Sequence, residues 1–336
     1  MRHFDGVELL HPALRTPRFL GRPFRLTLSM SLPASAKLPS LRIAFGPEQS
    51  GVFEAGLPVL AGESAEELFR AAAPAGKEGA LTLFRTDAWL LGAARVPLTD
   101  GLEAASRRLY LDIFRAARGL QLARIWNYVP AINEIGAGGL ENYRLFCRGR
   151  SLAFEEHHGA DFKALLPSAS AVGCGSETLT VSFAASARIP RHIENPLQVP
   201  AYDYPADYGP RAPSFARASV VPGADGTATV FISGTAAIRG HATVAPDNLA
   251  GQMDCTVENL REISTACGLG PYLDRRGHSQ RHFKVYVRNA ADQPAIAKRL
   301  EKEFLKAGDH VSYLQADICR EPLLVEIEAT LLGVKG

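Results

Sequence analysis

The sequence predicts an α+β fold made of two similar units, each a mixed sheet packed on two helices. Strands and helices follow the same order in each half of the 336-residue chain. Their alternation is typical of helices that cover one face of a sheet. Residues 188–214, between the two runs, contain six prolines, which is typical of a loop. We therefore expect one domain over residues 1–190 and a second over residues 191–336.

The first half has the order strand, helix, strand, helix, strand. The expected strands are rich in apolar residues, and the first helical segment ends on a glycine, a common C-terminal cap. The expected elements are a strand over residues 80–92, a helix over 104–119, a strand over 123–132, a helix over 140–150 and a strand over 176–186.

The second half repeats this order. Val257, Leu260, Ile263 and Cys267 recur at helical spacing, and Gly268 follows them as a cap. The expected elements are a strand over residues 227–238, a helix over 252–268, a strand over 281–290, a helix over 293–304 and a strand over 323–333.

Charge and cysteine content argue against several classes of protein. The formal net charge is +2 without a basic run, which is a poor match to a nucleic-acid-binding protein. The five scattered cysteines form no CxxC pair, which is typical of a reduced intracellular protein. No apolar run is long enough to cross a membrane. Residues 24–36 resemble a signal peptide but lack a continuous apolar core, so we expect a strand there and a cytoplasmic protein.

The closing strand of the second half carries two acids, Glu326 and Glu328. Side chains alternate across a strand, so both carboxylates are expected on one face. Aligning the halves sets Ser182 against Glu326 and Ala184 against Glu328. A purely structural need should appear in both copies, so the difference favours a chemical role. The alternative is that both acids lie on a solvated face of the sheet.

Four motifs of the second half resemble the YjgF/RidA family. They are YGPRAPSFARASVV, FISGTAAI, ENLREISTACG and VEIEA, in this order over roughly residues 205–332. The resemblance implies YjgF/RidA-like, chorismate mutase-like modules in which the family's functional glutamate corresponds to Glu326. An arginine that trimeric members carry just before this strand has no clear counterpart here until Arg320. Two fused modules would give a pseudo-trimer-like arrangement with a cleft between them, the usual place for a small-molecule site.

The whole chain resembles the chorismatase family more closely. The similarity is carried by the motifs RIWNYVPAINE, ENYRLFCRGRSLAFE, NPLQVPAYDYPADYGPRAPSFARA, FISGTAAIRGHATV and DICREPLLVEIEA. Members of this family resemble fused YjgF-like modules and release pyruvate from chorismate. They form either a dihydroxycyclohexadiene carboxylate or 3-hydroxybenzoate, in some cases with 4-hydroxybenzoate.

Two positions bear on the product. The hydroxybenzoate-forming members resemble this chain in having a cysteine seven residues before the catalytic glutamate, and Cys319 occupies that position. Ala236 lies where the branches of the family also differ. The resemblance therefore implies an enzyme that forms 3-hydroxybenzoate. The alternatives are the diene-forming hydrolase and a non-catalytic YjgF-like protein that binds a small molecule.

Chorismate is a dianion with an enol ether, so a site for it needs an acid and cationic groups. Glu326 is the candidate general acid, because burial beside a second carboxylate raises the pKa of a carboxyl group toward neutrality. Cys319 could donate a hydrogen bond or steer the chemistry of the ring hydroxyl, although a buried cysteine is commonly inert. Trp126 is expected either to line the pocket or to lie in the core.

Arginines are the candidates for binding carboxylates, because the guanidinium matches a carboxylate with two hydrogen bonds. Tyr143 and Arg150 are seven residues apart, two helical turns, and so share a helix face. Arg217 shares a strand face with Phe215, where an arginine is costly unless an anion pairs with it. The alternative for each arginine is exposure to solvent. Three residues of the proline-rich loop could close the cleft: Tyr204, Tyr208 and Arg211.

No metal or organic cofactor is expected. Protonation of an enol ether requires neither, and the pairs His157–His158 and His278/His282 lack partners at ligand spacing. Nucleic acid and membrane are not expected as partners, and the resemblance implies the small molecule chorismate as the substrate. Because the second module could complete the cleft within one chain, we expect a monomer.

Overall fold

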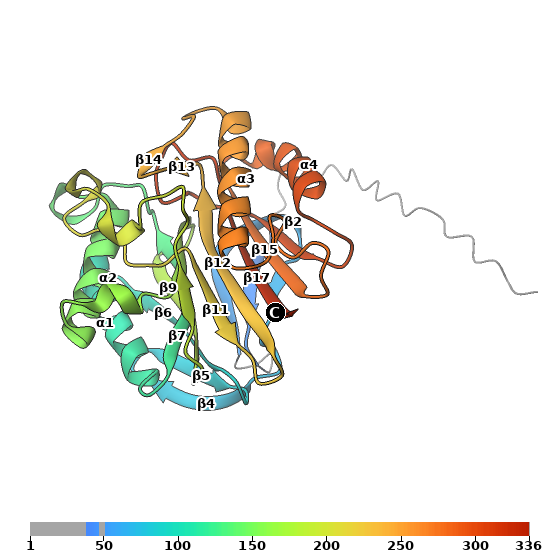
Figure 1. Cartoon of the computed structure of the whole chain (residues 1–336). Helices are drawn as coiled ribbons and strands as arrows, with labels where there is room; N and C mark the ends of the chain where they lie inside the picture. Colours follow the sequence, from blue (N-terminus) through green and yellow to red (C-terminus); the bar gives the residue numbers. More distant parts are fainter. Residues whose placement is uncertain (1–37, 47–50, 336) are drawn as a thin grey trace, which may run out of the picture. The chain divides into compact units, whose positions relative to one another are not determined.

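Two large β-sheets, a two-stranded hairpin and four α-helices make up residues 38–46 and 51–335, the part of the chain that this computed structural model describes (Figure 1). The strand expected over residues 24–36 lies outside these ranges. The helices are α1 (Leu102–Ala116), α2 (Asn142–His158), α3 (Leu249–Ala266) and α4 (Gln293–Glu303).

One sheet has six strands and the other has nine. The six-stranded sheet has the order β4 (Ala73–Glu78), β5 (Leu81–Arg85), β6 (Leu90–Pro97), β9 (Thr178–Ser186), β7 (Gln121–Pro130) and β8 (Ser168–Cys174). The nine-stranded sheet has the order β10 (Arg191–Ile193), β11 (Ala218–Pro222), β12 (Thr227–Ala236), β17 (Val325–Lys335), β15 (Gln280–Val287), β16 (His310–Gln315), β2 (Val52–Gly62), β1 (Ser40–Ala44) and β3 (Ala65–Glu66). The hairpin is β13 (Ile238–Arg239) and β14 (Ala242–Thr243).

The predicted internal repeat is confirmed by the strand order. Five strands of the first sheet, β5-β6-β9-β7-β8, match five strands of the second, β11-β12-β17-β15-β16. In each set the last two strands are parallel and the other neighbours are antiparallel. The sheets are therefore mixed, as the α+β prediction requires.

The strand pairing is consistent with the predicted alignment. Trp126 pairs with Ser182 in the first sheet, and Tyr286 pairs with Glu326 in the second. An alignment that sets Ser182 against Glu326 therefore also sets Trp126 against Tyr286.

Several strands were not predicted. Strand β8 contains the small residues of SASAVGC, and β16 is only six residues long, so neither gives a strong strand pattern. Strands β1, β2 and β3 precede the first module in the sequence but extend the second sheet beyond β16. The described residues belong to one compact unit, and the domain boundary near residue 190 stays a prediction.

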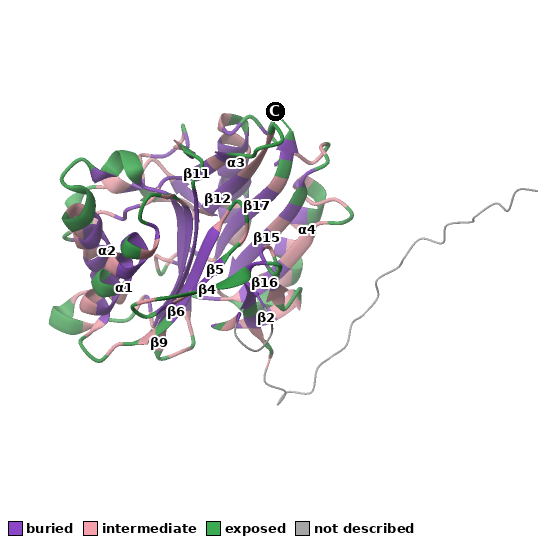
Figure 2. Ribbon diagram, turned by 90° about the horizontal axis from the view of Figure 1, so that it is seen from below, coloured by how far each residue is buried: buried purple, intermediate pink, exposed green. Residues whose placement is uncertain are grey.

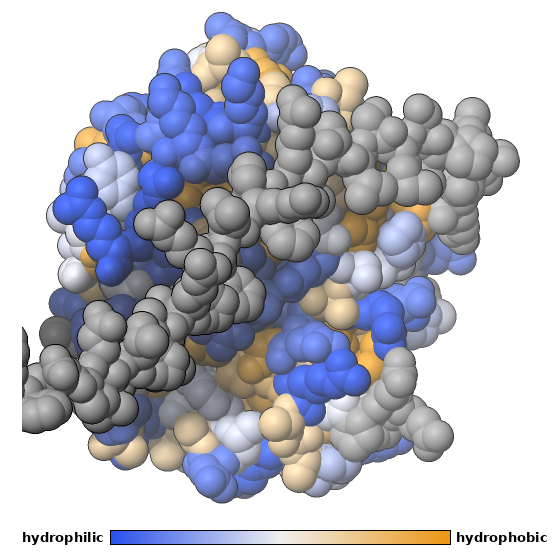
Figure 3. Space-filling model, turned by 90° about the vertical axis from the view of Figure 1, so that its right-hand side faces the viewer, coloured by the Kyte–Doolittle hydropathy of each residue, from blue (hydrophilic) through white to orange (hydrophobic). Residues whose placement is uncertain are grey.

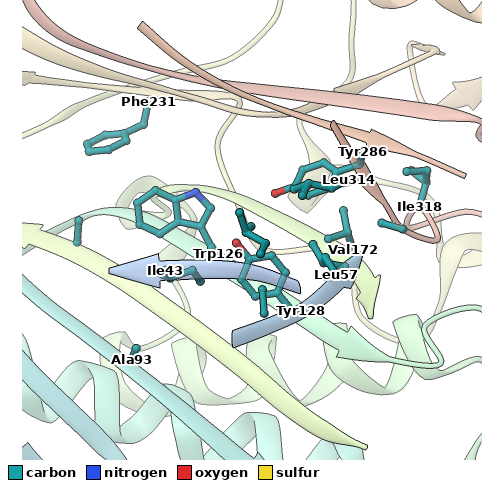
Figure 4. Close-up of a cluster of buried hydrophobic side chains, with 14 of the residues drawn as sticks. Ile43, Leu57, Ala93, Trp126, Tyr128, Val172, Phe231, Tyr286, Leu314 and Ile318 are labelled. Carbon is teal, nitrogen blue, oxygen red and sulfur yellow. The ribbon is translucent and has the colours of Figure 1, made fainter. Parts of the chain in front are cut away.

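The layers are helix, sheet, sheet, helix. Helices α1 and α2 cover the outer face of the six-stranded sheet, and α3 and α4 cover the outer face of the nine-stranded sheet (Figures 1 and 2). Between the sheets lies a third apolar cluster, with Trp126 and Tyr128 from β7 and Tyr286 from β15 (Figure 4). The interface between the modules is therefore a buried core.

Strand β17 directs its acids into this interface. The alternate residues Val325, Ile327 and Ala329 pack in the core beneath α3 and α4. Glu326 and Glu328 therefore point to the opposite face, toward the six-stranded sheet. The expectation that both acids share one face is confirmed, and the alternative of a solvated face is wrong, because both side chains are buried.

On the face of the molecule shown in Figure 3, hydrophilic side chains are interspersed with smaller apolar areas. Within residues 38–46 and 51–335, no helix combines the length and the apolar character needed to cross a membrane.

Candidate active site

A cavity of about 410 Å³ opens between the two modules. Helix α2 and strand β8 line it from the first module. Strand β12 and the loop that leads into β17 line it from the second. The proline-rich segment between the modules contributes further side chains. This segment is ordered into short 3-10 turns at Ala201–Asp203 and Ala206–Tyr208.

The structure brings together eight of the nine residues predicted for the site. The cavity is lined by Tyr143, Arg150, Tyr204, Tyr208, Arg217, Ala236, Cys319 and Glu326. Arg211 does not line it. Its guanidinium lies 2.7 Å from the carboxylate of Glu155 and is 35% exposed, so this arginine forms a surface ion pair.

Glu326 is the acid of the cavity. Its side chain is only 4% exposed, and the Cys319 thiol donates to its Oε2 across 3.9 Å. Burial, and next the charge of Glu328, raise the pKa of Glu326 to about 8. The carboxyl group is therefore largely protonated at neutral pH and can act as a general acid.

Glu328 has different surroundings, although it is two residues away on the same strand face. It is not among the residues that line the cavity. Burial alone would raise its pKa, but the charges of Lys284 and Arg124 outweigh burial and lower the pKa to about 2. One buried carboxyl group is therefore protonated and its neighbour is ionised. Acid–base sites commonly use two carboxyl groups whose pKa values are separated in this way.

Arg150 places a buried positive charge against the cavity. It is 1% exposed, and its Nε has no hydrogen-bond partner. Its guanidinium lies 5.0 Å from the ring of Phe146 and 3.9 Å from the Cys147 sulfur. No carboxylate of the described ranges forms an ion pair with it. Since a buried charge is costly without a counter-ion, the arrangement favours an anionic ligand.

Arg217 contributes a second cation. Its Nη2 donates to the Tyr204 hydroxyl across 2.7 Å, and its Nε has no hydrogen-bond partner. The ring of Phe215 lies 5.0 Å from the guanidinium, as the shared face predicted. The cavity can therefore receive two carboxylates.

Arg320 is a cation of the cavity that we did not predict as a site residue. Its guanidinium lies 4.1 Å from the ring centroid of Tyr208 and 5.2 Å from that of Tyr204. It also donates to the carbonyl oxygen of His241 across 2.8 Å. Arg320 thus holds the two tyrosines of the proline-rich segment against the rim. Its signal in the sequence was its place before the closing strand, where Arg320 was the first possible counterpart of the YjgF/RidA family arginine.

Gly234 on β12 is a further residue that the sequence analysis did not single out. A Cβ atom at this position would lie 1.9 Å from Oε1 of Glu326, so only glycine leaves room for the carboxyl group. A glycine within a strand often marks a place where another group comes close to the backbone. This pattern could have identified Gly234 from the sequence.

Burial raises the pKa of the Cys319 thiol to about 12, with the charge of Glu326 as the next cause. Cys319 is therefore a neutral donor rather than a thiolate nucleophile.

The described ranges contain no group of three or more His, Cys, Asp or Glu side chains that could hold a metal ion. His282 stacks on His310 with ring centroids 4.3 Å apart. Trp126 lies in the core between the sheets.

Comparison with known proteins identifies the family. A 3-hydroxybenzoate synthase from Streptomyces hygroscopicus is 38% identical over 269 residues, which cover 76% of this chain and 78% of that protein. The chain belongs to the chorismatase family. A chorismatase from Streptomyces rapamycinicus is 38% identical over 280 residues, which cover 80% of this chain and 83% of that protein.

A crystal structure of a chorismatase superposes with a TM-score of 0.73 at 30% identity, covering 90% of this chain and 96% of that one. The family model "Chorismatase FkbO/Hyg5-like, N-terminal" matches residues 67–185. These matches confirm the predicted family and the predicted fold class, and they assign the chain to a family of enzymes.

Proposed function

We propose that the chain converts chorismate to 3-hydroxybenzoate and pyruvate, with or without some 4-hydroxybenzoate. The observation that carries the proposal is a protonated carboxyl group, Glu326, in a cavity that also holds two buried arginines, Arg150 and Arg217, whose Nε atoms have no hydrogen-bond partner among the described residues. Chorismate offers two carboxylates for the arginines and an enol ether for the acid.

In the proposed reaction, Arg150 and Arg217 bind the carboxylates, and Glu326 gives its proton to the methylene carbon of the enolpyruvyl group. This forms the new C–H bond of the pyruvate methyl group and leaves an oxocarbenium-like carbon. The bond between the ring and the ether oxygen then breaks, and this oxygen leaves as the ketone oxygen of pyruvate. To give 3-hydroxybenzoate, the neighbouring ring hydroxyl must shift to the carbon that carried the ether, and the proton lost from that carbon as the ring becomes aromatic can restore Glu326. Loss of a proton without this shift gives 4-hydroxybenzoate. Hydroxybenzoate and pyruvate together contain the atoms of chorismate, so neither water nor an oxidant is consumed.

Two features support hydroxybenzoate as the product. Cys319 contacts the carboxyl group of Glu326, at the position where hydroxybenzoate-forming members carry a cysteine. One relative at 38% identity is named a 3-hydroxybenzoate synthase. Other relatives of the same identity are named chorismatase, so the diene-forming hydrolase is the second candidate.

Incubation of the purified chain with chorismate, followed by chromatography, tests the proposal. We expect pyruvate and an aromatic acid in equal amounts. A non-aromatic diene would support the hydrolase. Chorismate that is bound but recovered unchanged would show a binding protein instead.

We further infer that the enzyme acts as a monomer in the cytoplasm. One chain supplies a cavity with an acid and its arginines, and the five cysteines are free thiols. Light scattering at assay concentration tests the monomer, and fractionation of the producing cells tests the location.

A further inference from the structure

Glu328 joins the two modules through a buried cluster of charges. From β7 of the first module, Arg124 donates to it across 2.7 Å and the Trp126 indole across 2.9 Å. From β15 of the second module, Lys284 lies 3.0 Å away and the Tyr286 hydroxyl donates across 3.0 Å.

The repeat explains why these donors converge. Arg124 pairs with Ala184 on β9, and Lys284 pairs with Glu328 on β17. In the alignment that sets Ala184 against Glu328, Arg124 and Lys284 correspond to each other, and both reach the same carboxylate. The first copy has Ala184 at the position aligned with Glu328. A single carboxylate therefore binds a cation from each sheet.

The cluster as a whole is neutral. Its fourth charge is Glu66 on β3, which lies 2.5 Å from Lys284 and does not line the cavity. Two cations and two anions balance, and all four side chains are at most 9% exposed. Protonation of Glu328 is costly, because it would leave two buried cations with only one anion.

We propose that Glu328 is a positioning residue whose fixed negative charge keeps Glu326 in its protonated, proton-donating form. This inference rests on the proposed function for its catalytic meaning. Its physical basis is that same-face neighbours on a strand lie about 7 Å apart, and that a like charge in a shared buried site disfavours a second ionisation.

Other groups around Glu326 act in the opposite direction. Arg124 from β7 and Arg217, which precedes β11, lower its pKa, as does the hydrogen bond from Cys319 in the loop before β17. Glu328 is the charge that acts together with burial to raise it.

The test is a titration of Glu326 without substrate. Protein labelled with 13C at the glutamate carboxyl carbons is followed by NMR, and the Glu326 signal is the one absent from Glu326→Gln. We expect Glu328→Gln to lower the titration midpoint by about one unit or more. The matched control is Glu66→Gln, which makes the same charge change beyond Lys284, and we expect less than half of that shift. Glu328→Asp, which keeps the charge, should restore most of the midpoint.

An unchanged midpoint in folded Glu328→Gln would overturn the proposal, as would equal shifts in the two glutamine variants. If Glu328→Gln does not fold, the double variant Glu328→Gln/Lys284→Met removes an ion pair and keeps the cluster neutral. Its midpoint should still fall, and a midpoint equal to the wild-type value would overturn the proposal.

The titration separates this inference from the proposed function. A lowered midpoint in a chain that does not consume chorismate would contradict the function alone. Chorismate turnover with an unmoved midpoint would contradict the role of Glu328 alone.

Discussion

Arg150 on α2 and Glu326 on β17 line one cavity from opposite modules, and they are only 1% and 4% exposed. The first is a buried cation without a carboxylate partner, and the second is a carboxyl group whose pKa is raised to about 8. The buried charge of Arg150 is costly without a carboxylate counter-ion, and Glu326 holds a proton that it can donate. Arg150 and Glu326 are both suited to an anionic ligand that accepts a proton.

Replacing Glu326 by glutamine should reduce chorismate turnover by about 10²- to 10⁴-fold, the usual contribution of a general acid. The amide has nearly the same shape and cannot donate a proton to carbon. Pyruvate release measures the effect, and circular dichroism checks the fold. Glu301→Gln, on the exposed face of α4, is the matched control and should retain full activity. Undiminished turnover in Glu326→Gln would exclude the assignment.

The pH profile of kcat/KM should fall as pH rises through about 8, with a limiting slope of about one decade per unit. The reason is that Glu326 must carry its proton, and its pKa is raised to about 8. Steady-state rates of pyruvate release between neutral and alkaline pH measure this profile. An activity that rises through the same range would indicate a base in place of an acid.

Arg150→Met should raise KM for chorismate by about 10- to 100-fold, because one charged contact to a carboxylate is lost. It should cost little stability, since the buried arginine forms no ion pair with a carboxylate of the described residues and is replaced by an apolar side chain. The matched control is Arg281→Met. Arg281 is equally buried but forms an ion pair with Asp309 and hydrogen bonds to carbonyl groups.

The control should therefore lose about 3–5 kcal/mol of stability and keep its KM. Thermal unfolding and steady-state kinetics on both variants separate the two roles. A large loss of stability in Arg150→Met, with KM unchanged, would make Arg150 structural.

The sequence was sufficient for the repeat, because β17 and its counterpart β9 carry clear apolar alternation. The alignment of Ser182 with Glu326 is consistent with the strand pairing. The resemblance pointed to Glu326 as the acid, but the sequence alone did not show that Glu328 is held as an anion by Arg124 and Lys284. Which of Glu326 and Glu328 meets the cavity depends on where Arg124 lies, and that depends on how one sheet packs on the other.

The direction of the side chains in the proline-rich segment could not be predicted from the sequence either. Tyr204, Tyr208 and Arg211 are close together in the sequence and were predicted as a group. The chain reverses through short turns, so both tyrosines reach the cavity while Arg211 turns toward Glu155. Irregular segments lack a periodicity from which the direction of a side chain can be inferred.

Gly234→Ala should lower kcat with little change in overall fold. The added Cβ would lie 1.9 Å from Oε1 of Glu326, so the carboxyl group must move away from its position. A displacement of about 1 Å at a reacting group can cost about 10²-fold in rate. Gly175→Ala is the matched control, because its Cβ would have no neighbour nearer than 3.7 Å. Equal kcat values for the two variants would show that the carboxyl position tolerates the shift.

Glu326 should also make the stability of the protein depend on pH. Its pKa is raised from 4.5 to about 8 in the folded state, so the folded state binds more protons than the unfolded state between these values. The resulting stabilisation is complete below pH 4.5 and is lost as pH rises through about 8, a change of about 5 kcal/mol. Glu328 acts with the opposite sign, but its window lies below pH 4.5 and does not overlap.

Urea unfolding of wild type and Glu326→Gln at pH 5 and pH 8 isolates this contribution. The glutamine variant cannot ionise at position 326, so its stability should change less between the two pH values than that of the wild type. At pH 8 the variant should be the more stable protein, because the wild type bears the cost of a buried carboxyl near its ionisation point. If the two proteins lose stability in parallel between pH 5 and pH 8, Glu326 is not the titrating group, and the acid in the cavity must be assigned again.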